Sequence, residues 1–304
     1  MPWLELCVTV GSDQQAAIEA ALTDLGALSI TLEDAEDAPI LEPAPGETPL
    51  WPTIALSALF KPERGRTALI DAMVERVPEL ARSRLVCNEI ADRDWTREWM
   101  DRFQPMRFGR RLWIYPSTIE PPTDNDAVVV RLDPGLAFGT GTHATTALCL
   151  EWLDAIEPAG RSVIDYGCGS GVLAIAALKL GAAHALGVDN DPQALIASRA
   201  NAELNNVDRR LALAAPDNVG SARCDVLVAN ILAGPLCQLA SRFASLLKPG
   251  GLIALSGILH GQEDEVIESC SEWFDDVHIV AHEGWLRVEA VRCGSTKRNA
   301  DPLL

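Results

Sequence analysis

Hydrophobic and polar residues alternate in several short stretches within the first 90 residues. The period of two over residues 3–10 (Trp-Leu-Glu-Leu-Cys-Val-Thr-Val) predicts a strand, because successive side chains of a strand point to opposite faces. Between such stretches, apolar residues recur every three or four positions, which predicts helices. The resulting order, βαββαβ, is typical of a small ferredoxin-like α+β domain. The strands are expected at 3–10, 27–33, 53–60 and 84–90, the helices at 12–25 and 64–77, and a proline- and acid-rich loop at 34–52.

From about residue 143 the pattern changes to helices that alternate with short apolar strands. Before it, residues 105–132 contain short strands around a proline-rich turn. Regular alternation predicts a parallel sheet with helices on both faces, because right-handed crossovers place them there. The last two strands have only a short loop between them and predict an antiparallel hairpin at one edge. The helices are expected at 143–156, 171–180, 192–205, 234–247 and 262–273, and the strands at 162–166, 184–189, 211–214, 225–229, 252–257, 277–282 and 286–292.

These two patterns and a length of 304 residues predict two domains. The first covers residues 1–91 and the second residues 104–294, followed by a polar, flexible tail at 295–304. Residues 92–103 contain no Gly or Pro and place aromatic residues four apart, which predicts a linker helix with one aromatic side. Packing between domains explains that stripe better than stacking on bases does.

The net charge of −18 disfavours a broad phosphate-binding surface, because nonspecific affinity for nucleic acid comes from Lys and Arg. Ten acidic residues and no Lys or Arg lie in residues 1–60, which favours a basic partner, although acidity that only keeps the protein soluble is an equally good interpretation. No apolar run reaches the roughly 20 residues that span a bilayer, and no secretory signal is visible. We expect a cytoplasmic monomer that does not enter membranes or bind nucleic acid sequence-specifically.

Cysteine and histidine spacing predicts neither disulfides nor a metal site. The eight cysteines are scattered without a Cys-x-x-Cys pair, and the five histidines lack His-Glu-x-x-His spacing. Reduced, mostly buried thiols are therefore expected, with no bound metal.

A glycine-rich turn follows the predicted strand at 162–166. The stretch Val163-Ile-Asp-Tyr-Gly-Cys-Gly-Ser-Gly171 leads into a strong helix former, and its glycines would let the backbone approach a ligand closely. The G-x-G-x-G spacing differs from the G-x-G-x-x-G that seats a dinucleotide pyrophosphate. Asp165 would repel a pyrophosphate but attract a sulfonium and its ammonium, so it favours a cationic cofactor. Gly167, Gly169 and Asp165 are therefore predicted to bind the cofactor.

Two polar residues at strand ends are further predicted ligand contacts. Asp189 ends the next apolar strand, where a carboxylate can accept hydrogen bonds from both ribose hydroxyls; a structural role as helix cap suits Asp191 better. Asn230 ends a later strand, where its carboxamide could accept an amine N–H and orient the nitrogen lone pair. A cap of the following helix is the alternative role for Asn230.

Upstream lies a loop rich in glycine and threonine, Leu132-Asp-Pro-Gly-Leu-Ala-Phe-Gly-Thr-Gly-Thr-His-Ala-Thr-Thr146, which leads into a helix. Its glycines suit backbone that folds over a ligand, Thr142 could cap the helix, and Thr146 offers a hydroxyl one turn in. His143 could accept a proton, although a histidine that begins a helix is more often structural. Phe138 and Thr140 are also predicted to contact the cofactor.

The motifs together resemble the PrmA family, bacterial methyltransferases of ribosomal protein L11. The resemblance covers residues 131–259 and rests on Leu-Asp-Pro-Gly-Leu-Ala-Phe-Gly-Thr-Gly-Thr-His, the glycine-rich stretch, Gly-Val-Asp-Asn-Asp-Pro, Val-Ala-Asn-Ile-Leu-Ala-Gly-Pro-Leu and Leu-Ser-Gly-Ile-Leu. Ala144 departs from the Pro expected in the family. The resemblance implies a class I methyltransferase Rossmann-like sheet with an antiparallel C-terminal edge hairpin, and a ferredoxin-like N-terminal domain for substrate recognition. It implies S-adenosylmethionine contacts at Thr146, Gly167, Asp189 and Asn230.

The family resemblance also implies a reaction. Lysine side-chain amines and the N-terminal amine of L11 would be methylated, up to the trimethylated state, by in-line attack and without a covalent enzyme intermediate. A class I methyltransferase that acts on another protein or on a nucleic-acid nitrogen is the alternative, because Asn230 stands where such enzymes carry Asn-Pro-Pro-aromatic. Here the residues read Asn-Ile-Leu-Ala, without the base-stacking platform. A non-enzymatic RNA-binding module lacks its aromatic signature, and an NAD-dependent oxidoreductase is disfavoured by the glycine spacing.

Overall fold

The computed structural model of the chain describes residues 3–36, 49–90, 104–121, 126–133, 143–221 and 223–294. The chain divides into two compact units, Met1–Trp95 and Thr96–Leu304. The predicted linker helix at 92–103 and the predicted tail at 295–304 lie outside the described residues, so both stay predictions, as do the exact domain boundaries. No helix among the described residues is long and apolar enough to cross a membrane.

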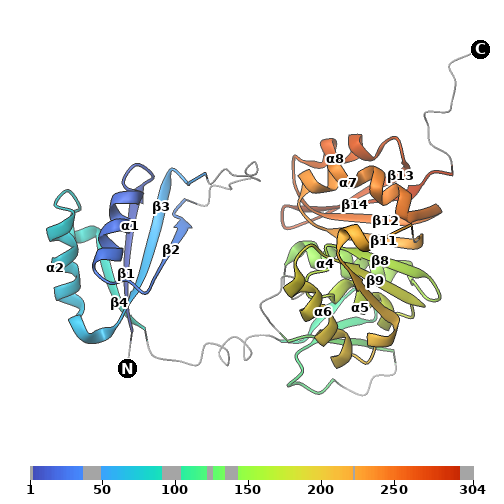
Figure 1. Ribbon diagram of the computed structural model, residues 1–304, viewed down its shortest axis with the longest axis horizontal. Helices are drawn as coiled ribbons and strands as arrows, with labels where there is room; N and C mark the ends of the chain where they lie inside the picture. Colours follow the sequence, from blue (N-terminus) through green and yellow to red (C-terminus); the bar gives the residue numbers. More distant parts are fainter. Residues whose placement is uncertain are drawn as a thin grey trace, which may run out of the picture. The chain divides into compact units, whose positions relative to one another are not determined.

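The smaller unit has the predicted βαββαβ order. Its four strands form an antiparallel sheet in the order β2-β3-β1-β4, and every second residue of β1 is buried. Helices α1 and α2 cover one face, where Leu6, Leu22 and Met73 are fully buried (Figure 1). The elements are β1 (Trp3–Gly11), α1 (Gln15–Asp24), β2 (Ser29–Asp34), β3 (Thr53–Phe60), α2 (Arg66–Arg76) and β4 (Leu85–Ile90), with short 3₁₀ turns at Pro62–Arg64 and Arg82–Arg84.

The larger unit contains a seven-stranded sheet in the order β10-β9-β8-β11-β12-β14-β13. The first five strands are parallel, whereas β14 runs antiparallel to β12 and β13 pairs antiparallel with β14. This confirms the predicted α/β fold with an antiparallel hairpin at one edge. The strands are β8 (Ser162–Tyr166), β9 (His184–Val188), β10 (Leu211–Ala214), β11 (Cys224–Asn230), β12 (Leu247–Leu259), β13 (Phe274–His282) and β14 (Trp285–Arg292).

Helices cover both faces of this sheet, because its central strands are apolar on both sides. Val163 packs with α4, α5 and α6, whereas the next residue, Ile164, packs with α7 and α8 on the opposite face (Figure 1). Only the ends of the strands are therefore left for a ligand. The helices are α4 (Ala144–Ile156), α5 (Val172–Lys179), α6 (Pro192–Leu204), α7 (Ala233–Leu246) and α8 (Glu263–Cys270), with 3₁₀ turns at Asp208–Arg210 and Pro216–Asn218.

A separate three-stranded sheet packs against α4 and α5. It consists of β5 (Met106–Phe108), β6 (Leu112–Tyr115) and β7 (Val128–Arg131). Asp154, which is 1% exposed, fastens this sheet to α4 by accepting the backbone N–H groups of Arg110 at 2.6 Å and Arg111 at 3.3 Å. The last turn of α4 is thus fastened to the three-stranded sheet.

Candidate functional site

A cavity of about 210 Å³ opens at the carboxyl ends of β8, β9 and β11. This is the edge where parallel α/β sheets bind ligands, because loops diverge there between neighbouring strands. Five of the residues predicted from the sequence to bind the cofactor or the amine substrate come together in its lining. The lining consists of Thr146, Gly167, Cys168, Gly169, Val172, Leu173, Asp189, Asn190, Asn230 and Ile231.

The glycine loop after β8 has a backbone that other residues rarely adopt. Gly167, Gly169 and Gly171 have φ angles of 82°, 52° and 78°. A Cβ atom on Gly167 would lie 2.2 Å from Cγ2 of Ile231, so this glycine also allows the segment after β11 to approach the loop. The loop therefore presents bare backbone to the cavity, as the sequence predicted.

Asp189 is held by the loop while retaining capacity to bind a ligand. Its Oδ2 accepts the Gly169 N–H at 2.8 Å and its Oδ1 accepts the Asp191 N–H at 2.9 Å. A carboxylate offers about four lone-pair sites, so about two remain for a pair of vicinal hydroxyls. Asp191 caps α6 by accepting the Gln193 N–H at 2.8 Å, which fills the capping role that was the alternative for Asp189.

Asp165 lies beneath the cavity rather than in its wall. Its side chain is 0% exposed, and its Oδ2 accepts the Ala174 N–H at 3.0 Å, which fastens α5 to the end of β8. The pKa of this carboxyl is raised to about 7: burial is the main cause, the Ala174 hydrogen bond opposes the shift, and the nearby charge of Asp189 adds to it. Its Oδ1 has no hydrogen-bond partner among the described residues. This geometry therefore does not favour the direct contact with the cofactor that was predicted for Asp165.

Asn230 ends β11 and is oriented by Thr146 across the cavity. The Asn230 Nδ2 donates to Thr146 Oγ1 at 3.3 Å, and Thr146 itself is buried in the first turn of α4. Leu232 occupies the N-cap position of α7 and makes no side-chain cap hydrogen bond, so Asn230 does not hold the capping position that was its alternative role. With Nδ2 directed at Thr146, the Asn230 Oδ1 is the atom of this carboxamide that can accept an amine N–H.

His143 begins α4 and is its cap. Its Nδ1 accepts the Thr145 N–H at 3.3 Å and lies 2.8 Å from Thr145 Oγ1, and its ring packs edge-to-face against Trp285 with centroids 4.8 Å apart. The helix is thus capped by His143, whereas Thr142, which was predicted as a possible cap, lies outside the described residues. Phe138 and Thr140 lie outside the described residues, so their predicted cofactor contacts stay predictions.

Two residues that build the site were not assigned a role from the sequence. Gly257, in β12, has a φ of 88°, and a Cβ there would lie 2.2 Å from the Ile231 backbone oxygen. Ile231 therefore fits between Gly257 on one side and Gly167 on the other, and this fixes the chain beside Asn230. The only sign of this role in the sequence is the glycine of Leu-Ser-Gly257-Ile-Leu. Ile231, which packs against it, is 26 residues away in sequence and comes next to it only because β11 pairs with β12.

The cavity contains neither a reactive thiol nor a metal site. Cys168 lines it, but its side chain is only 5% exposed, and burial raises the pKa of the thiol to about 12. A thiol that is protonated at neutral pH is a poor nucleophile. Within the part of the chain that the structure describes, no three His, Cys, Asp or Glu residues are grouped to hold a metal ion.

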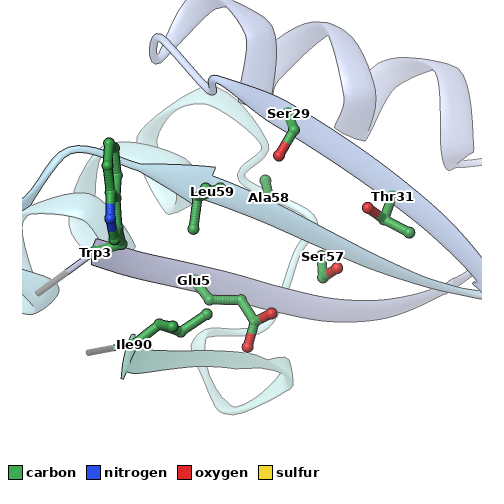
Figure 2. A pocket seen from close by; sticks show the side chains of 8 residues that line it. All are labelled: Trp3, Glu5, Ser29, Thr31, Ser57, Ala58, Leu59 and Ile90. Atoms are coloured by element: carbon green, nitrogen blue, oxygen red, sulfur yellow. The ribbon is translucent and has the colours of Figure 1, made fainter. Parts of the chain in front are cut away.

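A larger hollow, of about 520 Å³, lies on the open sheet face of the smaller unit. Figure 2 shows its lining side chains, which come from all four strands. Despite its size, the hollow has one carboxylate, hydroxyls and apolar groups, without a glycine turn or a converging set of polar atoms. Chemistry therefore belongs to the smaller cavity, and the hollow suits contact with another molecule. Its lining is Trp3, Glu5, Ser29, Thr31, Ser57, Ala58, Leu59 and Ile90.

The strand order, the glycine turn after β8 and the acidic end of β9 define a class I methyltransferase. The family model described as "Ribosomal protein L11 methyltransferase (PrmA)" matches residues 2–293, and the chain belongs to this family. A protein named ribosomal protein L11 methyltransferase from Pseudomonas paraeruginosa is 54% identical over 294 residues, which cover 96% of this chain and 99% of the relative. One of the same name from Shewanella amazonensis is 51% identical with the same coverage.

A solved structure resembles part of this chain. The ribosomal protein L11 methylase from Lactobacillus delbrueckii subsp. bulgaricus aligns with a TM-score of 0.58 and 33% sequence identity. The alignment covers 63% of this chain and 100% of that chain. The predicted family and fold class are confirmed.

Proposed function

We propose that this methyltransferase uses S-adenosylmethionine to methylate lysine side-chain amines and the N-terminal amine of ribosomal protein L11. The observation that carries the proposal is the Asn230 carboxamide at the end of β11, oriented by its 3.3 Å hydrogen bond to Thr146 beside the glycine loop. The cofactor, when bound, supplies a sulfonium methyl group to the amine nitrogen and leaves as a neutral thioether.

The residues of the cavity fit this cofactor. Gly167 and Gly169 line the cavity without side chains of their own, and the lone pairs of Asp189 that the backbone does not use suit the two ribose hydroxyls of the cofactor. Asp165, beneath the loop, keeps the start of α5 in place rather than touching the ligand.

Asn230 holds the amine that accepts the methyl group. Its Oδ1 accepts one amine N–H, which directs the nitrogen lone pair towards the methyl carbon. Because the cofactor would keep the electron pair of its broken C–S bond on sulfur, this chain needs no nucleophile of its own, and the task left to Asn230 is to hold the amine. The proton lost by the amine goes to water, because His143 uses its Nδ1 to cap α4. Positioning therefore contributes more to the rate than proton transfer by a side chain does.

The choice of L11 as substrate follows the names of the close relatives, and the smaller unit supports it. On the open face of its sheet, the outward side chains of β1, β2, β3 and β4 among the described residues include Glu5 and Glu33 but no Lys or Arg. A basic protein would be attracted to such a face. Trp3 and Ile90 add apolar surface at one end of the hollow (Figure 2). We infer that this face recognises the substrate in the cytoplasm.

The test combines labelled cofactor with L11 purified from cells that lack the enzyme. We expect label at amines of L11, located by mass spectrometry, and an at least 100-fold lower rate in Asn230→Ala with little change in cofactor affinity, since a misplaced acceptor costs about that much. Asn206→Gly, which removes an exposed asparagine with a φ of 58°, is the control that should leave the rate unchanged. Label in RNA or in another protein would overturn the substrate, and an active Asn230→Ala would overturn the role of Asn230.

A further inference from the structure

An aromatic pair lies one helical turn before Thr146, the residue that binds Asn230. His143 and Trp285 pack with ring centroids 4.8 Å apart, and both side chains are partly exposed. His143 is close to the site because its carbonyl oxygen accepts the Thr146 N–H at 3.0 Å, and Thr146 in turn binds Asn230. Trp285 does not line the cavity beside the glycine loop. Neither the sequence motifs nor the proposed reaction assigns it a function.

The fold fixes Trp285 at the same edge of the sheet as Asn230. β12 lies between β11 and β14, and it pairs Ser256 with Asn230 on one side and Leu259 with Trp285 on the other. The Ser256 hydroxyl also donates to the Thr145 backbone oxygen at 3.4 Å, which ties the start of α4 to this strand. Trp285 therefore lies beyond the sheet end on the β12 side of Asn230, whereas Asp189 and the glycine loop lie on the β8 side.

This placement matters because the acceptor changes its chemistry during the reaction. An amine that has received methyl groups is a cation at neutral pH, and each methyl group replaces an N–H that could bind Asn230. After the third transfer no N–H is left, so Asn230 can no longer form a hydrogen bond to the product. An aromatic ring attracts such a cation through its negative face and also covers its methyl groups, whereas an unmethylated ammonium, which is a cation at neutral pH too, has no methyl groups for the ring to cover.

We propose that Trp285, with His143 packed against it, forms an aromatic wall that binds methylated ammonium groups and retains the substrate between successive transfers. The inference rests on the proposed amine methylation and adds the residue that governs how many methyl groups are transferred. Trp285 would contribute little to the first transfer and progressively more to the second and third.

The experiment follows L11 with intact-mass spectrometry at low conversion in wild type, Trp285→Leu and Trp285→Phe. We expect the Leu variant to lower the ratio of trimethylated to monomethylated product about fivefold, the gain that an exposed cation–π contact provides. Its first transfer and its affinity for S-adenosylhomocysteine should stay within about twofold of wild type, and the Phe variant should restore the ratio. Trp273→Leu is the matched control, because Trp273 packs on Arg292, with the guanidinium carbon 5.6 Å from the ring, at the opposite end of β14.

An unchanged product ratio in Trp285→Leu would overturn the inference, and so would an equal loss in all three transfers. A second measurement does not depend on L11: broadening of the methyl signal of free trimethyl-lysine in NMR, with S-adenosylhomocysteine bound. Wild type should broaden this signal and Trp285→Leu should not; equal broadening in both would overturn the aromatic wall. If wild type fails to methylate L11, the proposed substrate is wrong, and the NMR comparison alone decides the role of Trp285.

Discussion

The seven-stranded sheet is covered on both faces, whereas the four-stranded sheet keeps one face open. In the larger unit, helices bury both faces and leave only the strand ends, where backbone N–H groups hold Asp189 and Thr146 holds Asn230. In the smaller unit, α1 and α2 bury one face and the other presents a broad, shallow hollow. A sheet that is covered on both faces thus forms a narrow site with fixed polar atoms at its strand ends, which suits catalysis. A sheet with one open face offers a wide surface, which suits the binding of a protein substrate.

The largest expected effect comes from disturbing the narrow site through Gly257. In Gly257→Ala the new Cβ would meet the backbone oxygen of Ile231 at 2.2 Å, so the segment that carries Asn230 must move. We expect methyl transfer to fall about 100-fold, since a displacement of about 1 Å costs that much. The free energy of unfolding should also fall by about 2–4 kcal/mol, from overpacking and from the positive φ. Single-turnover rates and urea unfolding measure the two effects.

Gly250→Ala is the matched control for Gly257. Gly250 lies in the same strand and has a similar φ of 77°, but no atom lies within 4 Å of the position its Cβ would take. It should therefore lose only the about 1–2 kcal/mol that a left-handed conformation costs. Its methyl transfer should match wild type, so an equal loss of rate in both variants would show that backbone strain, and not contact with Ile231, disturbs the site.

A smaller effect is expected from the open face. Glu5 lies in the hollow, and Glu5→Lys places a cation where a basic substrate would dock. We expect the KM for L11 to rise about tenfold, because like charges in an interface oppose association, with kcat and cofactor affinity unchanged. Steady-state kinetics at low salt measure this. Glu75→Lys changes the net charge equally, but on α2, which covers the other face, so it should leave KM unaltered. Equal effects of the two variants would mean that only overall charge matters.

The elements of both sheets could be predicted from the sequence because each rests on local periodicity. The βαββαβ order and the alternating helices and strands are confirmed, with ends that differ by a few residues. The predicted helix at 262–273 ends at Cys270, because the chain turns over residues 271–273 before the buried Phe274 begins β13. Strand β12 is longer than predicted, since it pairs with β11 on one side and β14 on the other, and such pairing has no local signal.

A site residue could be predicted from the sequence only where its side chain has a suitable functional group and it lies at the end of a predicted strand. Asp189 and Asn230 meet both conditions, and they line the same cavity. Ile231, Gly257 and Trp285 act through neighbours that are distant in sequence, so no spacing pointed to them. Asp165 meets both conditions too, yet it lies under the loop, because its acceptor oxygen satisfies the Ala174 N–H at the start of α5.

The smallest effect on catalysis is expected for Asp165, and pH reveals its role. Burial raises its pKa from 3.8 to about 7 in the folded protein, so the folded state binds this proton more tightly than the unfolded state does. Stability from this group is therefore greatest at low pH and declines as the pH rises through the window between those two values, after which it is constant. Asp165→Asn carries no titrating proton. We expect the free energy of unfolding of wild type, relative to this variant, to fall between about pH 5 and about pH 7 and then level off.

Urea unfolding of wild type and Asp165→Asn across this range makes the comparison, because groups common to both proteins cancel. A difference that stays constant with pH would mean that the carboxylate remains charged, and hence that some group beneath the loop compensates it. If the difference in the free energy of unfolding falls with pH while methyl transfer is nearly unchanged, Asp165 stabilises the glycine loop and does not act in catalysis. The covered sheet would then hold two carboxylates with separate tasks, since Asp189 has lone pairs free at the cavity and Asp165 has lost all exposure to it.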